Sequence, residues 1–336
     1  MSNSGRYMPP EWAPHDATWM AFPRESYEES GLNREAVQRA WARVANVVSE
    51  YEAVSMLCHP DDEPLARQYL SSAVTLHPVP LNDAWLRDNG PSFVTDNGAL
   101  IAIDWRFNGW GQNTEFDWQL DDAVAARVAD LAGASVDRAE FVNEGGGIHV
   151  DGEGNVLLTD TVQLDPQRNG QHSRAEMTEE IHRFLGTDHA IWLPRGLYRD
   201  YLLNGTRGHV DMIACFTPVG SLLVHQQLDP SHPDFALWGE LMATLEPENL
   251  TIRPLPAPAT LKDHRDWVDY SYVNHYVCND AVICPTFEDA QDDHALGILS
   301  EVYPSRRIVG VEAREIFAMG GGIHCITQQQ PSLPAP

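Results

Sequence analysis

The sequence is poor in positive charge and almost without lysine. Lys262 is the only lysine among 336 residues, and the 22 Lys and Arg residues face 49 Asp and Glu, which gives a net charge of −27. A surface of this sign repels phosphate backbones and anionic membranes, so we expect neither nucleic acid nor membrane as a partner. The same field attracts small cations, although acidity that only keeps the chain soluble, as in a salty cytoplasm, is an alternative explanation.

The sequence also lacks the cysteine pairs that form disulfide frameworks or zinc ribbons. An odd number of cysteines without Cys-x-x-Cys spacing predicts free thiols and a reducing compartment. They are Cys58, Cys215, Cys278, Cys284 and Cys325. The N-terminus has no apolar signal core, and no apolar run approaches the length of a membrane span. We therefore expect a cytoplasmic location. The 14 histidines lack paired metal-ligand spacing, so no metal or other cofactor is expected.

Short strands and amphipathic helices alternate along the chain, which indicates an α/β fold. The helices are too few and too widely spaced for a doubly wound sheet. Apolar periodicity and turn residues predict helices at 34–51, 121–132, 173–186 and 289–302, strands at 53–57, 73–79, 92–94, 100–104, 155–158, 281–284 and 307–311, and a hairpin at 212–216 and 221–224. Ser173 and Glu176 form a predicted capping box at the start of the third helix. Residues 81–91 are expected to form a loop.

One short motif occurs twice. Gly-Gly-Gly-Ile-His stands at 145–149 and again at 320–324. This repetition indicates a module that is used more than once, with equivalent turns that face one common place. Chance repetition in a glycine-rich chain is the alternative.

Cys325 follows the second glycine run and is the candidate nucleophile. Three glycines let the backbone approach other groups closely, and a nucleophilic cysteine needs such access together with neighbours that favour the thiolate. A buried, unreactive thiol is the alternative interpretation, and we adopt that interpretation for the other four cysteines.

Gly208-His209-Val210-Asp211 offers an acid/base pair. On an extended strand, residues two apart face the same side, so His209 and Asp211 would project together. A carboxylate beside an imidazole can orient and tune it for proton transfer. Metal binding and a purely structural hydrogen bond remain alternatives at this stage.

Two further segments offer carboxylates. In 83–91, Asp88 could bind a cation and Trp85 could face one through its ring, whereas Arg87 is expected to pair with a carboxylate inside the fold. Glu144 precedes the first glycine run and could accept hydrogen bonds from a donor-rich ligand. A charged surface loop is the alternative for 83–91.

The combined inventory suits a guanidinium. This group is planar, always charged and carries five N–H donors, and about two carboxylates bind it in a bidentate manner. Attack on its central carbon needs a thiolate and a proton donor for the departing ammonia. The sequence supplies one such thiol, a histidine, and the carboxylates of Asp88, Glu144 and Asp211.

From residue 8 to residue 331 the chain resembles the agmatine deiminases, peptidyl-arginine-deiminase-like members of the guanidine-modifying (pentein) superfamily. The segments that carry the resemblance are MPPEWAPHDATWMAFP, LNDAWLRDNGPSFV, FNGWG, NEGGGIHVDGEGNVLLTD, GTRGHVDM, SYVNHYV and GGGIHCITQQQP. The resemblance implies a five-bladed α/β propeller of pseudo-fivefold ββαβ modules. It implies a single catalytic domain over 1–336, with an irregular start to about residue 15 and a tail from about residue 331.

The resemblance also implies roles for individual residues. Cys325 aligns with the nucleophile, His209 with the general acid/base, Asp88 and Asp211 with the guanidinium-binding carboxylates, and Glu144 with a further substrate-contacting carboxylate. The implied reaction converts agmatine and water to N-carbamoylputrescine and ammonia through a covalent S-alkylthiouronium, without a cofactor. The relatives are often oligomeric, so a homo-oligomer is expected.

Three positions depart from the family pattern and concern substrate choice. Gly205 stands where an acidic residue near the amine tail is usual, and Gly322 stands where Asn is usual. Arg207 would favour a carboxylate over an ammonium if it points inward; alternatively it points outward and pairs with Asp200 or another carboxylate. Other guanidines therefore remain alternative substrates: arginine, a peptidyl arginine or a guanidino acid. A metal-dependent hydrolase and a non-catalytic binder on the same fold remain as further alternatives.

Overall fold

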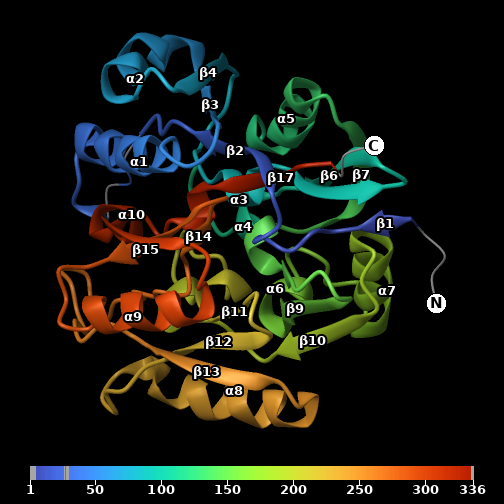
Figure 1. The fold of residues 1–336 in the computed structure, drawn as a ribbon, viewed down its shortest axis with the longest axis vertical. Coiled ribbons are helices and arrows are strands. Elements are labelled where there is room, and N and C mark those ends of the chain that lie inside the picture. The colour runs from blue at the N-terminus through green and yellow to red at the C-terminus, as the bar shows by residue number, and fades with distance from the viewer. Residues whose placement is uncertain (1–4, 26, 28–29, 334–336) are drawn as a thin grey trace.

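The described part of the chain forms five small sheets flanked by helices. The computed structural model describes residues 5–25, 27 and 30–333. In these residues the strand orders are β1-β5-β6-β7, β10-β9-β8, β11-β12-β13, β14-β15-β16 and β17-β2-β3-β4. Figure 1 shows α1, α5, α7, α8 and α9 on the outside of the molecule, with the strands toward its centre.

Each sheet contains the same ββαβ unit, in which an antiparallel strand pair is followed by a helix and a parallel strand. Four of the five units are continuous in sequence. They are β5 (Ser92–Asp96), β6 (Ala99–Arg106), α5 (Val124–Ala132) and β7 (Ser135–Val142); β8 (His149–Val150), β9 (Asn155–Thr159), α7 (Arg174–Leu185) and β10 (His189–Leu193); β11 (Ala214–Phe216), β12 (Ser221–Gln226), α8 (Leu237–Leu245) and β13 (Thr251–Pro256); and β14 (Tyr276–Val277), β15 (Ala281–Thr286), α9 (Asp292–Val302) and β16 (Arg307–Glu312).

The fifth unit joins the two ends of the chain. Its first strand, β17 (Gln328–Pro331), pairs antiparallel with β2 (His15–Ala21), which runs parallel to β3 (Val54–Cys58). Between β2 and β3 lies α1 (Arg34–Val48), and α2 (Glu63–Tyr69) and β4 (Val74–Pro78) extend the sheet. β17 and β2 lie side by side in Figure 1, so residues near both ends can reach one site.

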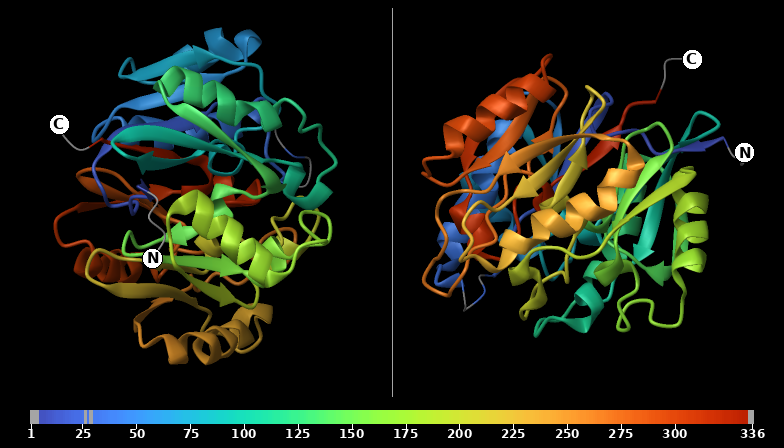
Figure 2. Two further views of the ribbon diagram at one scale, coloured as in Figure 1. Left: turned by 90° about the vertical axis from the view of Figure 1, so that its right-hand side faces the viewer. Right: turned by 90° about the horizontal axis from the view of Figure 1, so that it is seen from below.

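The remaining elements are short and connect or extend the units. They are β1 (Arg6–Tyr7), α3 (Leu86–Asn89), α4 (Gly109–Gln112), α6 (Asp160–Gln163) and α10 (Arg314–Ala318). The turned views of Figure 2 show the helices packed against the outer sides of the sheets. Buried apolar side chains join most of the units in one large cluster, and a smaller cluster lies between the sheets of β6 and β9.

The α/β class and the ββαβ module confirm the predicted fold class, whereas the pseudo-fivefold propeller stays a prediction. The predicted helices, strands and hairpin are present with shifted ends. The capping box of Ser173 and Glu176 forms. Gly186 ends the same helix in the left-handed conformation, at φ 72°, which glycine adopts without a steric penalty.

Three local predictions were wrong or incomplete. The irregular start contains β1, the loop 81–91 contains α3, and Pro331, expected in the tail, belongs to β17. Residues 1–4 and 334–336, which the same predictions cover, lie outside the described residues. In the described part of the chain no helix has the length and apolarity that a bilayer crossing requires.

Candidate active site

The predicted residues converge where α3 meets three short turns. These 3₁₀ turns are Gly145–Gly147, Val210–Met212 and His324–Ile326. α3 contacts the first and the last of them, and the first two contact each other. Asp88, Glu144, His209, Asp211 and Cys325 thereby come together although up to 237 residues separate them along the chain.

Gly146 forms one wall of this cluster. A Cβ atom built on Gly146 would lie 2.5 Å from Nδ1 of His209, 2.9 Å from Oδ1 of Asp88 and 3.1 Å from Oδ2 of Asp211. The imidazole and the two carboxylates therefore face one small space. Only glycine leaves this space open, because any side chain at position 146 would enter it.

Cys325 borders the same space and is almost buried, with 4% of its surface exposed. Its Sγ lies 3.2 Å from Nδ2 of Asn274 and 3.5 Å from Oδ2 of Asp211. Burial raises the pKa of the thiol well above its ordinary value, and the carboxylates of Asp211 and Asp88 act in the same direction. In the empty site the thiol therefore keeps its proton at neutral pH.

Asp211 has one occupied and one open oxygen. Its Oδ2 accepts a hydrogen bond from Nδ1 of His324 at 2.7 Å, and its buried Oδ1 has no hydrogen-bond partner among the described residues. Although burial opposes ionisation, His324 keeps the pKa of Asp211 below its ordinary value. The prediction that His209 and Asp211 share an extended strand was wrong, because His209 caps a 3₁₀ turn that contains Asp211.

Asp88 is held by two donors. Its Oδ2 accepts from the indole N–H of Trp110 at 2.9 Å, and its Oδ1 accepts from the backbone N–H of Gly146 at 3.1 Å. Burial raises the pKa of Asp88 to about 6, against the lowering effect of His209. Each oxygen keeps a second lone pair with which it could accept from a ligand.

His209 is buried between carboxylates. Its Nε2 lies 3.3 Å from Oε2 of Glu144, and its Nδ1 lies 3.7 Å from Oδ1 of Asp88 without a hydrogen-bond partner among the described residues. Burial alone would lower the pKa of His209, but Asp88 and Glu144 outweigh it and raise that pKa to about 9. His209 is thus a cation at neutral pH whose Nδ1 is free to donate.

Glu144 lies on the far side of His209, and its contact with a substrate stays a prediction. Glu144 is fully buried, and both of its oxygens accept from Nε of Arg168, at 2.9 and 3.1 Å. Oε2 also faces His209. Glu144 therefore supports His209 from behind, and Arg168 keeps the pKa of Glu144 below its ordinary value despite the burial.

A narrow cavity leads to Cys325. Trp85, Asp88, Trp110, Thr206, Gly321 and Cys325 are among its lining residues. Trp85 donates from its indole N–H to the hydroxyl of Tyr27 at 2.9 Å and packs edge-on against Trp41. The ring is thereby fixed at the wall of the cavity, and its contact with a cation stays a prediction.

Two of the three positions tied to substrate choice, Arg207 and Gly322, do not line this cavity. Nε of Arg207 lies 3.3 Å from Oδ2 of Asp165. The outward alternative therefore holds, and the carboxylate that Arg207 faces is that of Asp165. A Cβ on Gly322 would lie 2.3 Å from Oδ1 of Asn274.

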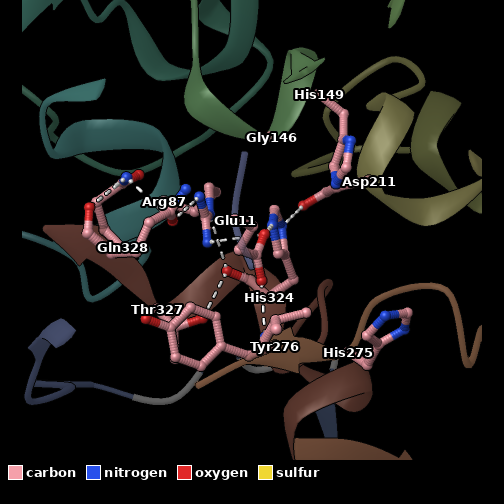
Figure 3. Close-up of polar contacts among 12 residues, drawn as sticks. Glu11, Arg87, Gly146, His149, Asp211, His275, Tyr276, His324, Thr327 and Gln328 are labelled. Atoms are coloured by element: carbon pink, nitrogen blue, oxygen red, sulfur yellow. Dashed lines mark hydrogen bonds and ion pairs between the residues drawn. The ribbon is translucent and has the colours of Figure 1, made fainter. Parts of the chain in front are cut away.

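Several site residues escaped the sequence-based prediction. Nε2 of His324 lies 2.8 Å from Oε2 of Glu11, and Arg87, predicted to pair with a carboxylate, approaches the same oxygen at 4.0 Å. Figure 3 shows His324 between Asp211 and Glu11. The repeated Ile-His pair was the available signal for His324, and the segment SYVNHYV was the signal for Asn274.

The repeated glycine motif does serve one common place, as predicted. Gly146 belongs to the first copy and borders His209 and Asp88, while Gly321 belongs to the second and lies against Trp85 and Cys325. The other four cysteines are buried, and burial raises the pKa of each. Among the described residues, no group of three or more His, Cys, Asp or Glu side chains is arranged to hold a metal ion.

Comparison with known proteins places the chain among deiminases. Residues 7–331 match the family model of Porphyromonas-type peptidyl-arginine deiminases. A Streptomyces coelicolor relative, whose agmatine deiminase name is provisional, is 50% identical over 333 residues, which cover 96% of this chain and 98% of the relative. The agmatine deiminase of Stutzerimonas stutzeri is 37% identical, and the matched region covers 98% of this chain and 96% of that protein. The structure of agmatine deiminase from Enterococcus faecalis superimposes with a TM-score of 0.90 at 30% identity, over 99% of both chains.

Proposed function

Because the chain belongs to the Porphyromonas-type peptidyl-arginine deiminase family, a family of hydrolases that act on guanidino C–N bonds, we propose that it deiminates agmatine through a covalent intermediate on Cys325. The products would be N-carbamoylputrescine and ammonia. The observation that carries the proposal is the common space that Gly146 leaves open between His209, Asp88 and Asp211, with the thiol of Cys325 at its edge.

The guanidinium binds between the carboxylates of Asp88 and Asp211. The open Oδ1 of Asp211 and the free lone pairs of Asp88 accept its N–H groups, as a planar fork of five donors requires. A cation between Asp88 and Asp211 offsets the two charges that, in addition to burial, hold the thiol protonated. Substrate binding therefore lowers the pKa of the Cys325 thiol, and its proton leaves to solvent.

In the first half-reaction a C–S bond forms and a C–N bond breaks. The thiolate adds to the guanidinium carbon and gives a neutral tetrahedral adduct. Nδ1 of the protonated His209 donates its proton to the departing nitrogen, and ammonia leaves. The product of this step is a positively charged S-alkylthiouronium on Cys325, with His209 neutral.

In the second half-reaction a water molecule replaces the sulfur. Neutral His209 takes a proton from the water, whose oxygen adds to the same carbon. The C–S bond then breaks, which returns the thiolate, and the hydroxyl proton leaves as the ureido carbonyl forms. His209 is again protonated, and the thiol regains its proton when the product departs. Glu144 and Asp88 favour the protonated state of His209, both before the first half-reaction and after the second.

The experiment that tests the proposal measures ammonia release from a panel of guanidines: agmatine, arginine, a peptidyl arginine and a guanidino acid. We expect turnover of agmatine and little of the carboxylate-bearing compounds. Turnover of a carboxylate-bearing guanidine without agmatine turnover would contradict the substrate. Absence of ammonia from every guanidine would contradict the reaction itself.

A further inference from the structure

Asn274 is a buried amide that lies against the sulfur of Cys325. It stands two residues before β14 and is 0% exposed. Its Nδ2 lies 3.2 Å from Sγ of Cys325. The deimination steps above use neither N–H group of this amide, although one of them reaches the atom that attacks the substrate.

The surrounding hydrogen bonds fix which end of the amide faces the sulfur. Its Oδ1 accepts from the backbone N–H of His324 at 3.0 Å and from that of Cys325 at 3.4 Å. Its Nδ2 donates to the carbonyl of Asp211 at 3.3 Å. A rotated amide would turn its donors toward two N–H groups and its oxygen toward a carbonyl, so it could satisfy none of these groups. One N–H of Nδ2 is thus directed to Asp211 and the other to Sγ.

Gly322 leaves the room that this amide occupies. A Cβ on Gly322 would lie 2.3 Å from Oδ1 and 2.9 Å from Cγ of Asn274. Burial and the carboxylates of Asp211 and Asp88 raise the pKa of the Cys325 thiol. The backbone N–H of Gly322 and the side chain of Asn274 act in the opposite direction. Two donors from separate segments of the chain therefore favour the ionised sulfur.

The donor matters for the thiolate and much less for the thiol. A thiol sulfur is a weak acceptor, and the S–H group of Cys325 can itself donate to Oδ2 of Asp211, which lies 3.5 Å from Sγ. A thiolate can only accept, and hydrogen bonds to ionised groups are about twice as strong as neutral ones. When the proton leaves Cys325, the N–H of Asn274 is already in place to stabilise the new charge.

We propose that Asn274 is a catalytic residue whose Nδ2–H stabilises the thiolate of Cys325. As a role in turnover the inference rests on the proposed deimination, in which the sulfur carries negative charge twice. It does so before it adds to the guanidinium carbon, and again when the C–S bond breaks and the electron pair returns to the sulfur. The oxygen of the same amide holds the turn that carries Cys325, which keeps donor and nucleophile at a fixed distance.

The test removes the donor and keeps the acceptor. Asn274→Asp leaves an oxygen for the two backbone N–H groups but offers no N–H to Sγ, whereas Asn274→Ala removes both functions. The readout is the rate at which iodoacetamide alkylates Cys325 at pH 8 without substrate. A charged hydrogen bond favours the thiolate by about 10- to 100-fold. The more basic thiolate of the variant recovers about half of that exponent, so alkylation should slow by about 3- to 10-fold in both variants.

Asn279→Ala is the matched control. The amide of Asn279 also holds a neighbouring segment, because Oδ1 accepts from the N–H of His15 at 2.8 Å and Nδ2 donates to the carbonyl of His15 at 3.0 Å. Alkylation in this variant should stay within about 2-fold of wild type. An unchanged rate in Asn274→Asp would overturn the inference. If Asn274→Ala alone were slow, the amide would only hold the turn.

Turnover of agmatine gives a second readout. Because both half-reactions use the thiolate, kcat of Asn274→Asp should fall by at least the factor measured in alkylation. Slower alkylation with an unchanged kcat would overturn the catalytic role. Absence of ammonia from every guanidine with the wild-type enzyme would overturn the deimination and with it the role in turnover. The alkylation rates need no substrate and would still decide whether Asn274 stabilises the thiolate.

A measurement on the wild-type chain covers the case in which neither variant folds. Asparagine side-chain amides are labelled with nitrogen-15 and followed by NMR while iodoacetamide alkylates Cys325. We expect one buried amide to respond, with a larger shift at the proton that faced the sulfur than at the proton held by the carbonyl of Asp211. If no asparagine amide responds, or if both protons shift equally, the inference is overturned.

Discussion

The Sγ atom of Cys325 lies 3.5 Å from Oδ2 of Asp211, the same oxygen that accepts a hydrogen bond from His324. A carboxylate this close to a buried thiol opposes thiolate formation. It also attracts a guanidinium to the sulfur. In the proposed reaction this arrangement ties activation of the nucleophile to the arrival of a cation, and the protonated thiol of the empty site should resist oxidation and alkylation.

Gly146→Ala tests the common space directly. The new methyl group would overlap Nδ1 of His209 and press on Asp88 and Asp211, so we expect a loss of kcat/KM of about 100-fold or more from misplacement alone. The measurement is ammonia release beside thermal unfolding. Gly239→Ala, in α8 with nothing within 4 Å of the new atom, is the control and should keep full activity. Normal activity in Gly146→Ala would contradict the site.

The basic limb of the pH–rate profile should report His209. Its pKa of about 9 in the empty site depends on Asp88 and Glu144, and the protonated form is the acid that releases ammonia, so kcat at saturating agmatine should fall as the pH rises and His209 loses this proton. Glu144→Gln removes one of the charges that raise this pKa and should shift the basic limb to lower pH. Glu180→Gln, on the exposed face of α7, is the control. An unshifted limb in Glu144→Gln would show that another group titrates.

The pH dependence of KM should report Asp88. Because burial raises its pKa to about 6, Asp88 is ionised above that pH and becomes protonated below it. Guanidinium binding needs the ionised form, so KM for agmatine should rise as the pH falls through about 6. Asp88→Asn should raise KM about 10-fold or more at pH 8, as expected for a lost charged hydrogen bond. Wild-type KM in this variant would contradict the assignment.

Several helices of the fold and two turns of the site could be predicted from the sequence, because they depend on local patterns. The helix over α7 follows from its capping box and terminal glycine, and the α1 helix from its apolar spacing. The glycine runs marked two turns of the site, since close backbone approach needs glycine. Family resemblance then supplied the roles of Cys325, His209 and Asp88, which spacing alone left open.

Other features depend on contacts between distant segments and carry no local signal. Glu11 and His324 are 313 residues apart and meet only because β17 pairs with β2 near the start of the chain. The direction of Arg207 is set by Asp165, which belongs to another loop. His209-Val210-Asp211 was assigned to a strand because alternation of polar and apolar residues over three positions fits a strand and a tight turn equally well.

Glu11→Gln tests how much the contact between Glu11 and His324 stabilises the fold. His324 holds the pKa of Glu11 well below its ordinary value despite burial, so the ionised Glu11 stabilises the fold above pH 4.5, and this contribution disappears as the pH falls through the lowered pKa. At pH 7 we expect Glu11→Gln to lower the free energy of unfolding by about 1–3 kcal/mol. Urea denaturation measures it. Glu35→Gln, an exposed residue of α1, should change stability by less than about 0.5 kcal/mol.

Mass spectrometry of the acid-quenched enzyme during agmatine turnover tests the central claim most directly. For the wild-type enzyme we expect an adduct with the mass of agmatine less ammonia on the peptide that contains Cys325. For Cys325→Ser we expect neither adduct nor turnover. Wild-type turnover by Cys325→Ser, or an adduct on any other residue, would contradict it.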